Sequence, residues 1–266
     1  MPVTRDVIVE IGGTPVRLAT EDPAFVEILH SRYAGFITDR PAVPPLHLKI
    51  HLVSGLASDA EDVRVTRSDG LWRFERSDFV AEWSPETGRG TVRQTLPNPY
   101  SIDTVLRILH SVVLAPQRGF LLHAASAIRH GRAFVFSGVS GAGKTTISRL
   151  APPDVTLLSD EISYIRPNGG RYWAFGTPFA GELARAGENV SAPIEAVFLL
   201  AQGPENRRDP VAPAEAARAL LRNILFFAED PNLVDLVFRS ALDCVSRVPV
   251  CRLTFVPDPK VWEMIG

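Results

Sequence analysis

A glycine-rich loop near the middle of this 266-residue sequence constrains its fold more than any other feature. Residues 138–145 read GVSGAGKT and match the pattern G-x-x-x-x-G-K-[ST] in full. Apolar residues 133–137 predict a strand before the loop, and the residues after it predict a helix through position 150. Glycine tolerates positive φ and close backbone approach, so consecutive N–H groups can converge on phosphate oxygens. The loop therefore predicts a phosphate-binding site in an α/β fold.

The residues of this loop have expected roles. Lys144 should reach the β- and γ-phosphates of ATP, and the Thr145 hydroxyl should bind Mg²⁺. The other expected nucleotide contacts are Gly138, Ser140, Gly141, Ala142, Gly143 and Thr146. The sequence has three lysines against twenty-five arginines, and a compact ammonium suits a position between phosphates better than a planar guanidinium does. The alternative is a chance match, which composition predicts in about one chain in a hundred of this length.

An acidic pair, Asp160-Glu161, follows residues 155–158, which predict a buried strand. Phosphoryl transfer needs a ligand for Mg²⁺ and, in kinases, a base near the acceptor hydroxyl. The pair follows Gly138 by 22 and 23 residues, which is enough chain for the loop, one helix and a returning strand. We therefore expect both carboxylates beside the loop, as Mg²⁺ ligands together with Thr145. The alternative is a solvated turn.

His123 lies on a strand predicted over residues 120–128, directly before the strand that leads into the loop. A lone histidine among apolar residues is more often part of a core than of a site. The other histidines, at positions 30, 47, 51, 110 and 130, show no metal-ligand spacing. Cys244 and Cys251 lie in apolar stretches and are expected to be buried thiols rather than a disulfide or a zinc site.

The first hundred residues are dominated by short alternating runs separated by turn formers. This pattern is typical of antiparallel strands and hairpins, so residues 1–100 are predicted to form a mostly β module. The expected strands are residues 7–11, 15–19, 46–53, 63–66, 71–76, 79–83 and 90–94.

A domain boundary is expected near residue 100, after Pro97-Asn98-Pro99. Ser101 is a candidate N-cap of a helix whose apolar residues recur at helical spacing through Val113. Residues 101–266 then alternate strands with helices. The further expected elements are a hairpin of residues 163–165 and 172–175, strands 196–201 and 251–256, and helices 212–227 and 233–245.

Charge and hydropathy exclude two classes of partner. A net charge of −2 and a pI near 6.3 provide no basic surface for nucleic acid. No run approaches the ~20 apolar residues that span a bilayer, and residues 1–10 mix charged with strand-forming residues instead of forming a signal-peptide core. The expected location is the cytoplasm.

The pattern around the loop resembles the HPr kinase/phosphorylase family, whose phosphate-binding loop is related to that of phosphoenolpyruvate carboxykinase. The resemblance consists of a strand with His123, a loop that begins at Gly138, 15 residues after that histidine, with Ser140 at its third position, and the pair Asp160-Glu161. It covers about residues 118–185. It implies an HPr-kinase-like P-loop domain at residues 101–266, after the β module. Shorter relatives of this family, beside ribosomal peptide-modification systems, are also similar, and some of them phosphorylate a peptide serine.

The resemblance implies that Asp160 is the general base, that Glu161 and Thr145 hold Mg²⁺, and that His123 lies beside the acidic pair or the phosphates. It also implies homo-oligomers. The sequence departs from the family after the acidic pair, where residues 173–182 read WAFGTPFAGE instead of a Glu-x-Arg-Gly-x-Gly segment. This departure leaves open whether HPr is the substrate and whether the reverse phosphorylase reaction occurs. Further candidates for substrate or metal contacts are Glu182, Arg166, Arg171 and Arg185.

Three functions are consistent with these residues. The leading one is an ATP- and Mg²⁺-dependent kinase that phosphorylates a hydroxyl, above all a serine, on a peptide, protein or small molecule. A second is a non-catalytic ATP-binding regulatory protein whose β module binds the partner. A third, a carboxykinase-like reaction on an oxaloacetate-type acid, needs further basic and metal-binding residues that the sequence does not identify.

Overall fold

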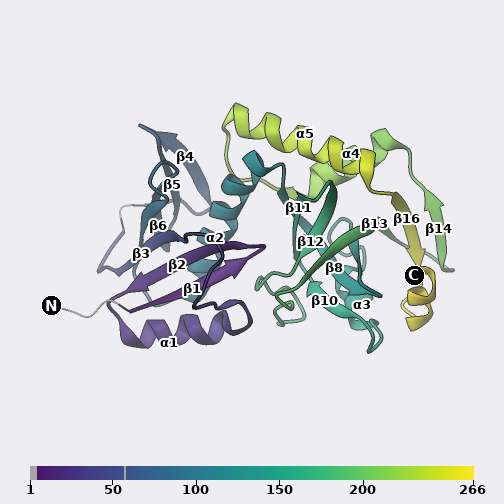
Figure 1. Cartoon of the computed structure of the whole chain (residues 1–266), viewed down its shortest axis with the longest axis horizontal. Coiled ribbons are helices and arrows are strands. Elements are labelled where there is room, and N and C mark those ends of the chain that lie inside the picture. Colours follow the sequence, from purple (N-terminus) through teal and green to yellow (C-terminus); the bar gives the residue numbers. More distant parts are fainter. Residues whose placement is uncertain (1–4, 57) are drawn as a thin grey trace. The chain divides into compact units, whose positions relative to one another are not determined.

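The computed structural model describes residues 5–56 and 58–266, and its fold is mixed α/β with two sheets (Figure 1). The chain divides into two units: the first extends to residue 112 and includes residues 227–231, and the second comprises residues 113–226 and 232–266. The boundary expected near residue 100 falls at the start of helix α2 (Pro99–Leu114), and the observed division falls near its end. Residues 1–4, part of the segment in which no signal peptide is expected, lie outside the described residues.

The first unit contains a seven-stranded sheet in the order β1-β2-β3-β7-β6-β5-β4. All seven predicted strands are confirmed. They could be predicted because a local alternation of apolar and polar residues marks each strand. Their bounds are β1 Arg5–Ile11, β2 Thr14–Thr20, β3 Leu46–Leu52, β4 Arg64–Ser68, β5 Leu71–Arg76, β6 Phe79–Ser84 and β7 Arg89–Gln94.

The antiparallel pairing expected of the strands in this module is wrong at β3, which runs parallel to both β2 and β7. The parallel pairing with β2 follows from helix α1 (Pro23–Arg32), which lies between these two strands and which the sequence analysis did not identify. A helix between β2 and β3 returns the chain to the starting end of the sheet, so the next strand runs in the same direction. Asp22 caps α1, since its Oδ1 accepts hydrogen bonds from Ala24 N and Phe25 N at 2.9 and 3.1 Å. A short 3₁₀ helix, Ala34–Phe36, follows.

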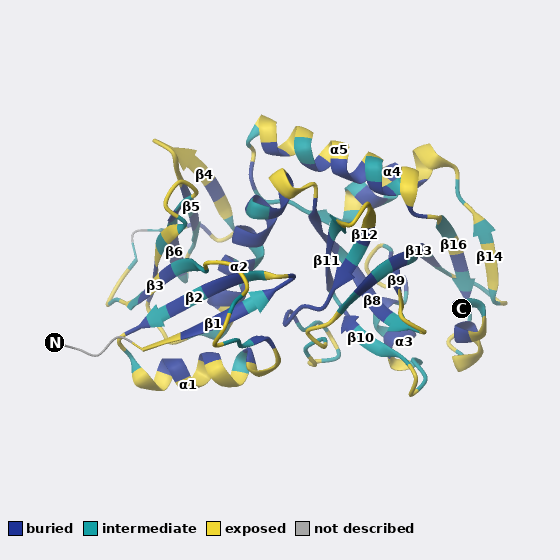
Figure 2. Ribbon diagram, in the orientation of Figure 1, coloured by how far each residue is buried: buried dark blue, intermediate teal, exposed yellow. Residues whose placement is uncertain are grey.

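Helix α2 confirms the predicted amphipathic helix but not its predicted N-cap. Ser101 lies inside the helix, and its Oγ donates to Asp78 Oδ2 at 2.7 Å. Asn98 takes the capping role instead, because its Oδ1 accepts from Tyr100 N at 3.0 Å. The apolar side of the helix, including Ile102, Leu106 and Leu109, is buried in the core of its unit (Figure 2).

The second unit is built on a nine-stranded sheet. Its strands are β8 Phe120–Arg129, β9 Arg132–Ser137, β10 Thr156–Ser159, β11 Ile162–Asn168, β12 Arg171–Phe175, β13 Ser191–Gln202, β14 Arg207–Pro210, β15 Ile224–Leu225 and β16 Val250–Phe255. The two short strands β14 and β15 were not predicted. Helices α3 Lys144–Arg149, α4 Pro213–Asn223 and α5 Pro231–Arg247 confirm the three that were, and 3₁₀ helices cover Ala115–Gln117 and Pro259–Met264.

Two pairing patterns position the site. Strands β9, β13 and β16 are parallel, with β13 between the other two, so their carboxyl ends meet at one edge of the sheet. Strand β8 pairs with β9 along one side and with both β10 and β11 along the other. The link between β10 and β11, which is Asp160-Glu161, therefore lies beside β8. The 3₁₀ helix at the end of the chain is tied to α3, because Trp262 Nε1 donates to Ile147 O at 3.1 Å.

Helix α5 illustrates how the helices of this unit cover its core. Its buried residues Leu233, Val237, Ala241 and Cys244 recur at helical spacing, and the opposite side is exposed (Figure 2).

Cys244 and Cys251 are free thiols, the first buried and the second partly buried. Among residues 5–56 and 58–266, no helix combines the length and apolar character needed to cross a bilayer.

Candidate functional site

The predicted phosphate-binding loop joins the carboxyl end of β9 to the short helix α3. Gly141 and Gly143 both have positive φ, 78° and 109°, which favours glycine at each position. Gly143 is constrained a second time, because a Cβ there would lie 2.6 Å from Phe255 Cζ. Helix α3 has only six residues, so an anion at the loop would depend on the loop amides and Lys144 rather than on a helix dipole.

Lys144 is buried at the start of α3, with 8% of its surface exposed. Its Nζ donates to Gly138 O at 3.1 Å and to Val139 O at 3.4 Å. Burial lowers the pKa of Lys144, and the negative charges of Glu161 and Glu182 act in the opposite direction. The ammonium therefore lies between the loop carbonyls and two carboxylates.

The acidic pair lies at the break between β10 and β11, which the preceding serine holds in place. Ser159 Oγ accepts from Glu161 N at 3.1 Å and from Ile162 N at 2.8 Å. Glu161 O in turn accepts from Ala124 N of β8 at 2.9 Å. The backbone of the pair is thus attached to the strand that carries His123.

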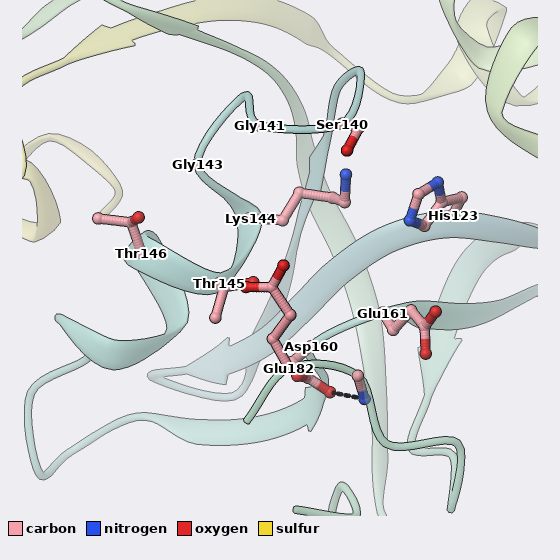
Figure 3. Close-up of a pocket in the computed structure, with 11 residues that line it drawn as sticks. His123, Ser140, Gly141, Gly143, Lys144, Thr145, Thr146, Asp160, Glu161 and Glu182 are labelled. Atoms are coloured by element: carbon pink, nitrogen blue, oxygen red, sulfur yellow. Dashed lines mark hydrogen bonds between the residues drawn. The ribbon is translucent and has the colours of Figure 1, made fainter. Parts of the chain in front are cut away.

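Asp160 is almost fully buried and holds a turn of the chain over the pair. Its Oδ1 accepts from Gly181 N and its Oδ2 from Leu183 N, both at 2.9 Å; Figure 3 shows one of these bonds. A Cβ on Gly181 would lie 2.8 Å from Glu161 Cβ and 3.0 Å from Asp160 Oδ2. Only glycine allows the turn, residues 181–183, to approach the carboxylates this closely.

These residues surround a cavity of about 320 Å³, here called the phosphate cavity. Most predicted site residues line it: His123, Ser140, Gly141, Gly143, Lys144, Thr145, Thr146, Asp160 and Glu161 (Figure 3). Gly181 and Glu182 complete the lining. Two predicted contacts are not among the lining residues: the Gly138 carbonyl accepts from Lys144, and the Ala142 side chain is buried in the core.

Of the four further candidates, only Glu182 lies at this cavity. The Arg166 guanidinium lies over the Phe175 ring, 4.9 Å from its centroid. Arg171 and Arg185 line other hollows of the same unit.

Sequence analysis did not identify Gln202, whose Nε2 donates to Gly141 O at 2.8 Å. No motif marks it, because it meets the loop only through the pairing of β13 with β9.

The oxygen atoms at the cavity fit a Mg²⁺ ion shared with phosphates. The Thr145 hydroxyl and the carboxylates of Glu161 and Asp160 are the hard oxygen ligands that Mg²⁺ prefers, and proteins commonly bind it through one or two carboxylates plus substrate phosphates. Within the part of the chain that the structure describes, no three His, Cys, Asp or Glu side chains gather closely enough to hold a metal by themselves. Bound Mg²⁺ would neutralise phosphate charge there.

Comparison with known proteins adds one family. A family model described as "ScmC: SynChlorMet cassette protein ScmC" matches residues 93–266. The sequence matches no protein of curated function. One similar solved structure is described as "Structure of the Hpr(Ser) kinase/phosphatase from Coxiella burnetii"; the match covers 51% of this chain and 78% of that chain at 9% identity, with a TM-score of 0.27. A TM-score this low carries no argument, so the HPr-kinase-like identity of this unit stays a prediction.

Proposed function

The chain belongs to the family of SynChlorMet cassette protein ScmC, and we propose that it is an ATP- and Mg²⁺-dependent kinase that phosphorylates a hydroxyl group. The acceptor class is a serine or other alcohol on a peptide, protein or small molecule. The observation that carries the proposal is the phosphate cavity. It brings Lys144 together with His123 and with the pair Asp160-Glu161, which are separated from Lys144 in the sequence. Cation, metal ligands and candidate base are the parts that phosphoryl transfer needs.

In the proposed reaction the acceptor oxygen attacks the γ-phosphorus of ATP, and the bond from that phosphorus to the β–γ bridging oxygen breaks, which leaves ADP. The hydroxyl proton passes to a carboxylate, for which Asp160 is the candidate. Asp160 already accepts one backbone N–H on each oxygen, but a carboxylate oxygen has a second lone pair available for a proton. Lys144 and the loop amides stabilise charge that develops on the phosphoryl oxygens. His123 lines the same space and can orient the acceptor.

The contacts of Asp160 also favour a second candidate function. A carboxylate that binds two backbone amides has a structural role in holding the turn 181–183 whether or not it accepts a proton. A nucleotide-binding regulatory protein, in which ATP occupancy controls this turn, would use the same contacts without transferring phosphate.

Incubation with Mg²⁺ and γ-labelled ATP tests the first function, with candidate peptides and small hydroxy compounds as acceptors. Lys144→Ala should abolish labelling of the acceptor, because it removes the cation at the phosphates. Lys260→Ala is the matched control, since Lys260 is exposed and is not among the residues lining the phosphate cavity. Binding of MgATP without label transfer to any acceptor would favour the regulatory function. Equal labelling by the Lys144→Ala variant would contradict the proposed role of the loop.

A further inference from the structure

A second cavity, of about 200 Å³, adjoins the phosphate cavity; it is here called the side cavity. Two residues, Gly143 and Thr146, line both spaces. In Figure 3 the Thr146 side chain lies on the opposite side of Lys144 from His123. The other residues that line the side cavity are Gln202, Gly203, Phe255 and Pro257.

The parallel strands explain why these residues meet. The phosphate-binding loop follows the end of β9, Gln202 ends β13, and Phe255 ends β16. Since these three strands are parallel neighbours, the loop and the two other strand ends lie along one edge. Ligands of parallel sheets bind at the carboxyl ends of the strands. A ligand whose phosphates are held by the loop would therefore extend along this edge into the side cavity.

The lining of the side cavity suits a flat aromatic ring better than further phosphates. None of the six described residues that line it carries a charge, and the Phe255 ring and Pro257 provide apolar surface. At about 200 Å³ it is smaller than the roughly 300–1,000 Å³ typical of pockets for whole ligands, so it accommodates one part of a larger molecule.

One polar group can orient such a ring. Gln202 Nε2 donates to Gly141 O at 2.8 Å, and this carbonyl fixes which end of the amide faces the loop. The acceptor oxygen, Oε1, is then on the other branch of the amide. An acceptor at this position can receive a hydrogen bond from the 6-amino group of adenine, whereas the 6-carbonyl oxygen of guanine would be repelled there.

The walls of the side cavity are held by contacts within the protein. Asn206 Oδ1 accepts from Val256 N at 3.0 Å, and Gly203 N donates to Phe255 O at 3.3 Å. Phe255 is 3% exposed and packs against Gly143. A preformed cavity binds its ligand without first ordering a loop, which favours affinity.

We propose that the side cavity binds the base of the nucleotide, and that the base is adenine, with its amino group directed to Gln202 Oε1. The inference rests on the proposed function for the identity of the ligand. It adds a base-binding site and a preference for ATP over GTP. The phosphates then lie in the phosphate cavity, and the sugar connects the two spaces past Gly143 and Thr146.

The test compares three probes by calorimetry: MgATP, Mg-tripolyphosphate, which lacks the base, and adenosine, which lacks the phosphates. Pro257→Ala should weaken MgATP about fivefold, since it removes apolar surface from the base, and leave tripolyphosphate unchanged within about twofold. Gln202→Ala should reduce the preference for ATP over GTP. Gln117→Ala is the matched control, because Gln117 is an exposed glutamine that also donates to a backbone carbonyl, Val113 O at 2.9 Å.

A second measurement maps the base directly: photolabelling with 8-azido-ATP should modify residues 202–206 or 255–257. Equal affinity for MgATP and Mg-tripolyphosphate, or label confined to other segments, would overturn the side cavity as the base site while the phosphate cavity stands. Adenosine binding that Pro257→Ala weakens, without any tripolyphosphate binding, would support the base site and contradict the proposed kinase. If none of the three probes binds, both proposals fail.

Discussion

Asp160 is the residue whose contacts bear most directly on the proposed chemistry. Asp160→Asn replaces one acceptor oxygen with a donor that faces a backbone N–H, and it removes the candidate base. We expect phosphoryl transfer to fall at least about 100-fold, the usual contribution of a general base. The affinity for MgATP should fall much less, because Thr145, Glu161 and the amide oxygen of the new side chain still offer oxygen ligands to Mg²⁺. Steady-state kinetics and calorimetry separate the two quantities.

Glu161→Gln is the comparison for this prediction. It leaves both bonds of Asp160 to the turn in place, so it should instead raise the Mg²⁺ concentration needed for half-maximal activity. Unchanged turnover in Asp160→Asn would remove Asp160 from the role of base and leave it a positioning residue.

His110 carries a separate prediction about stability in the first unit. Complete burial lowers its pKa to about 4, against about 6.5 in an unfolded chain. As pH falls from about 6.5 to about 4, the unfolded state takes up a proton that the folded state does not, so stability is lost across this window. The full loss is about 3 kcal/mol, of which about 2 kcal/mol falls between pH 7 and pH 5.

Urea denaturation at pH 7 and pH 5, read by hydrogen exchange of residues 99–112, measures this loss. His110→Leu introduces an apolar side chain of similar size that does not titrate. It should therefore remove most of the pH dependence of the free energy of unfolding. The same dependence in wild type and variant would show that another group titrates.

The turn 181–183 shapes the acidic side of the phosphate cavity. Gly181→Ala would place a Cβ 2.8 Å from Glu161 Cβ, so either the turn or the carboxylate must shift. We expect MgATP binding to persist and turnover to fall about tenfold or more, because misplacing a reacting group costs rate more than binding. Gly55→Ala is the control, since a Cβ there meets nothing within 4 Å. Full turnover in Gly181→Ala would mean that this turn does not position the pair.

Every described residue that lines the phosphate cavity or the side cavity belongs to the second unit. A fragment of residues 113–266 should therefore bind MgATP within a few-fold of the affinity of the full chain. Calorimetry, with circular dichroism to check folding, measures this. A folded fragment with no affinity would show that nucleotide binding needs the first unit.

Features that arise from short-range patterns can be predicted from the order of the amino acids alone. The loop around Lys144 is recognisable because its glycine and lysine spacing is required by the backbone itself, and alternation marks the strands of both units. The position of Asp160-Glu161 at a strand end could also be predicted, because the run of apolar residues before the pair stops there.

The contacts between groups that are distant in the sequence become visible in the folded chain. Gln202 and Gly141 are 61 residues apart, and Asp160 and Gly181 are 21 apart, so neither contact leaves a local pattern. The parallel pairing of β3 with β2 depends on α1. The sequence signals of this helix are weak, and the alternating runs on either side of it obscured them. Such contacts depend on strand pairing and chain crossings, which link positions far apart in sequence and are therefore visible only in the folded chain.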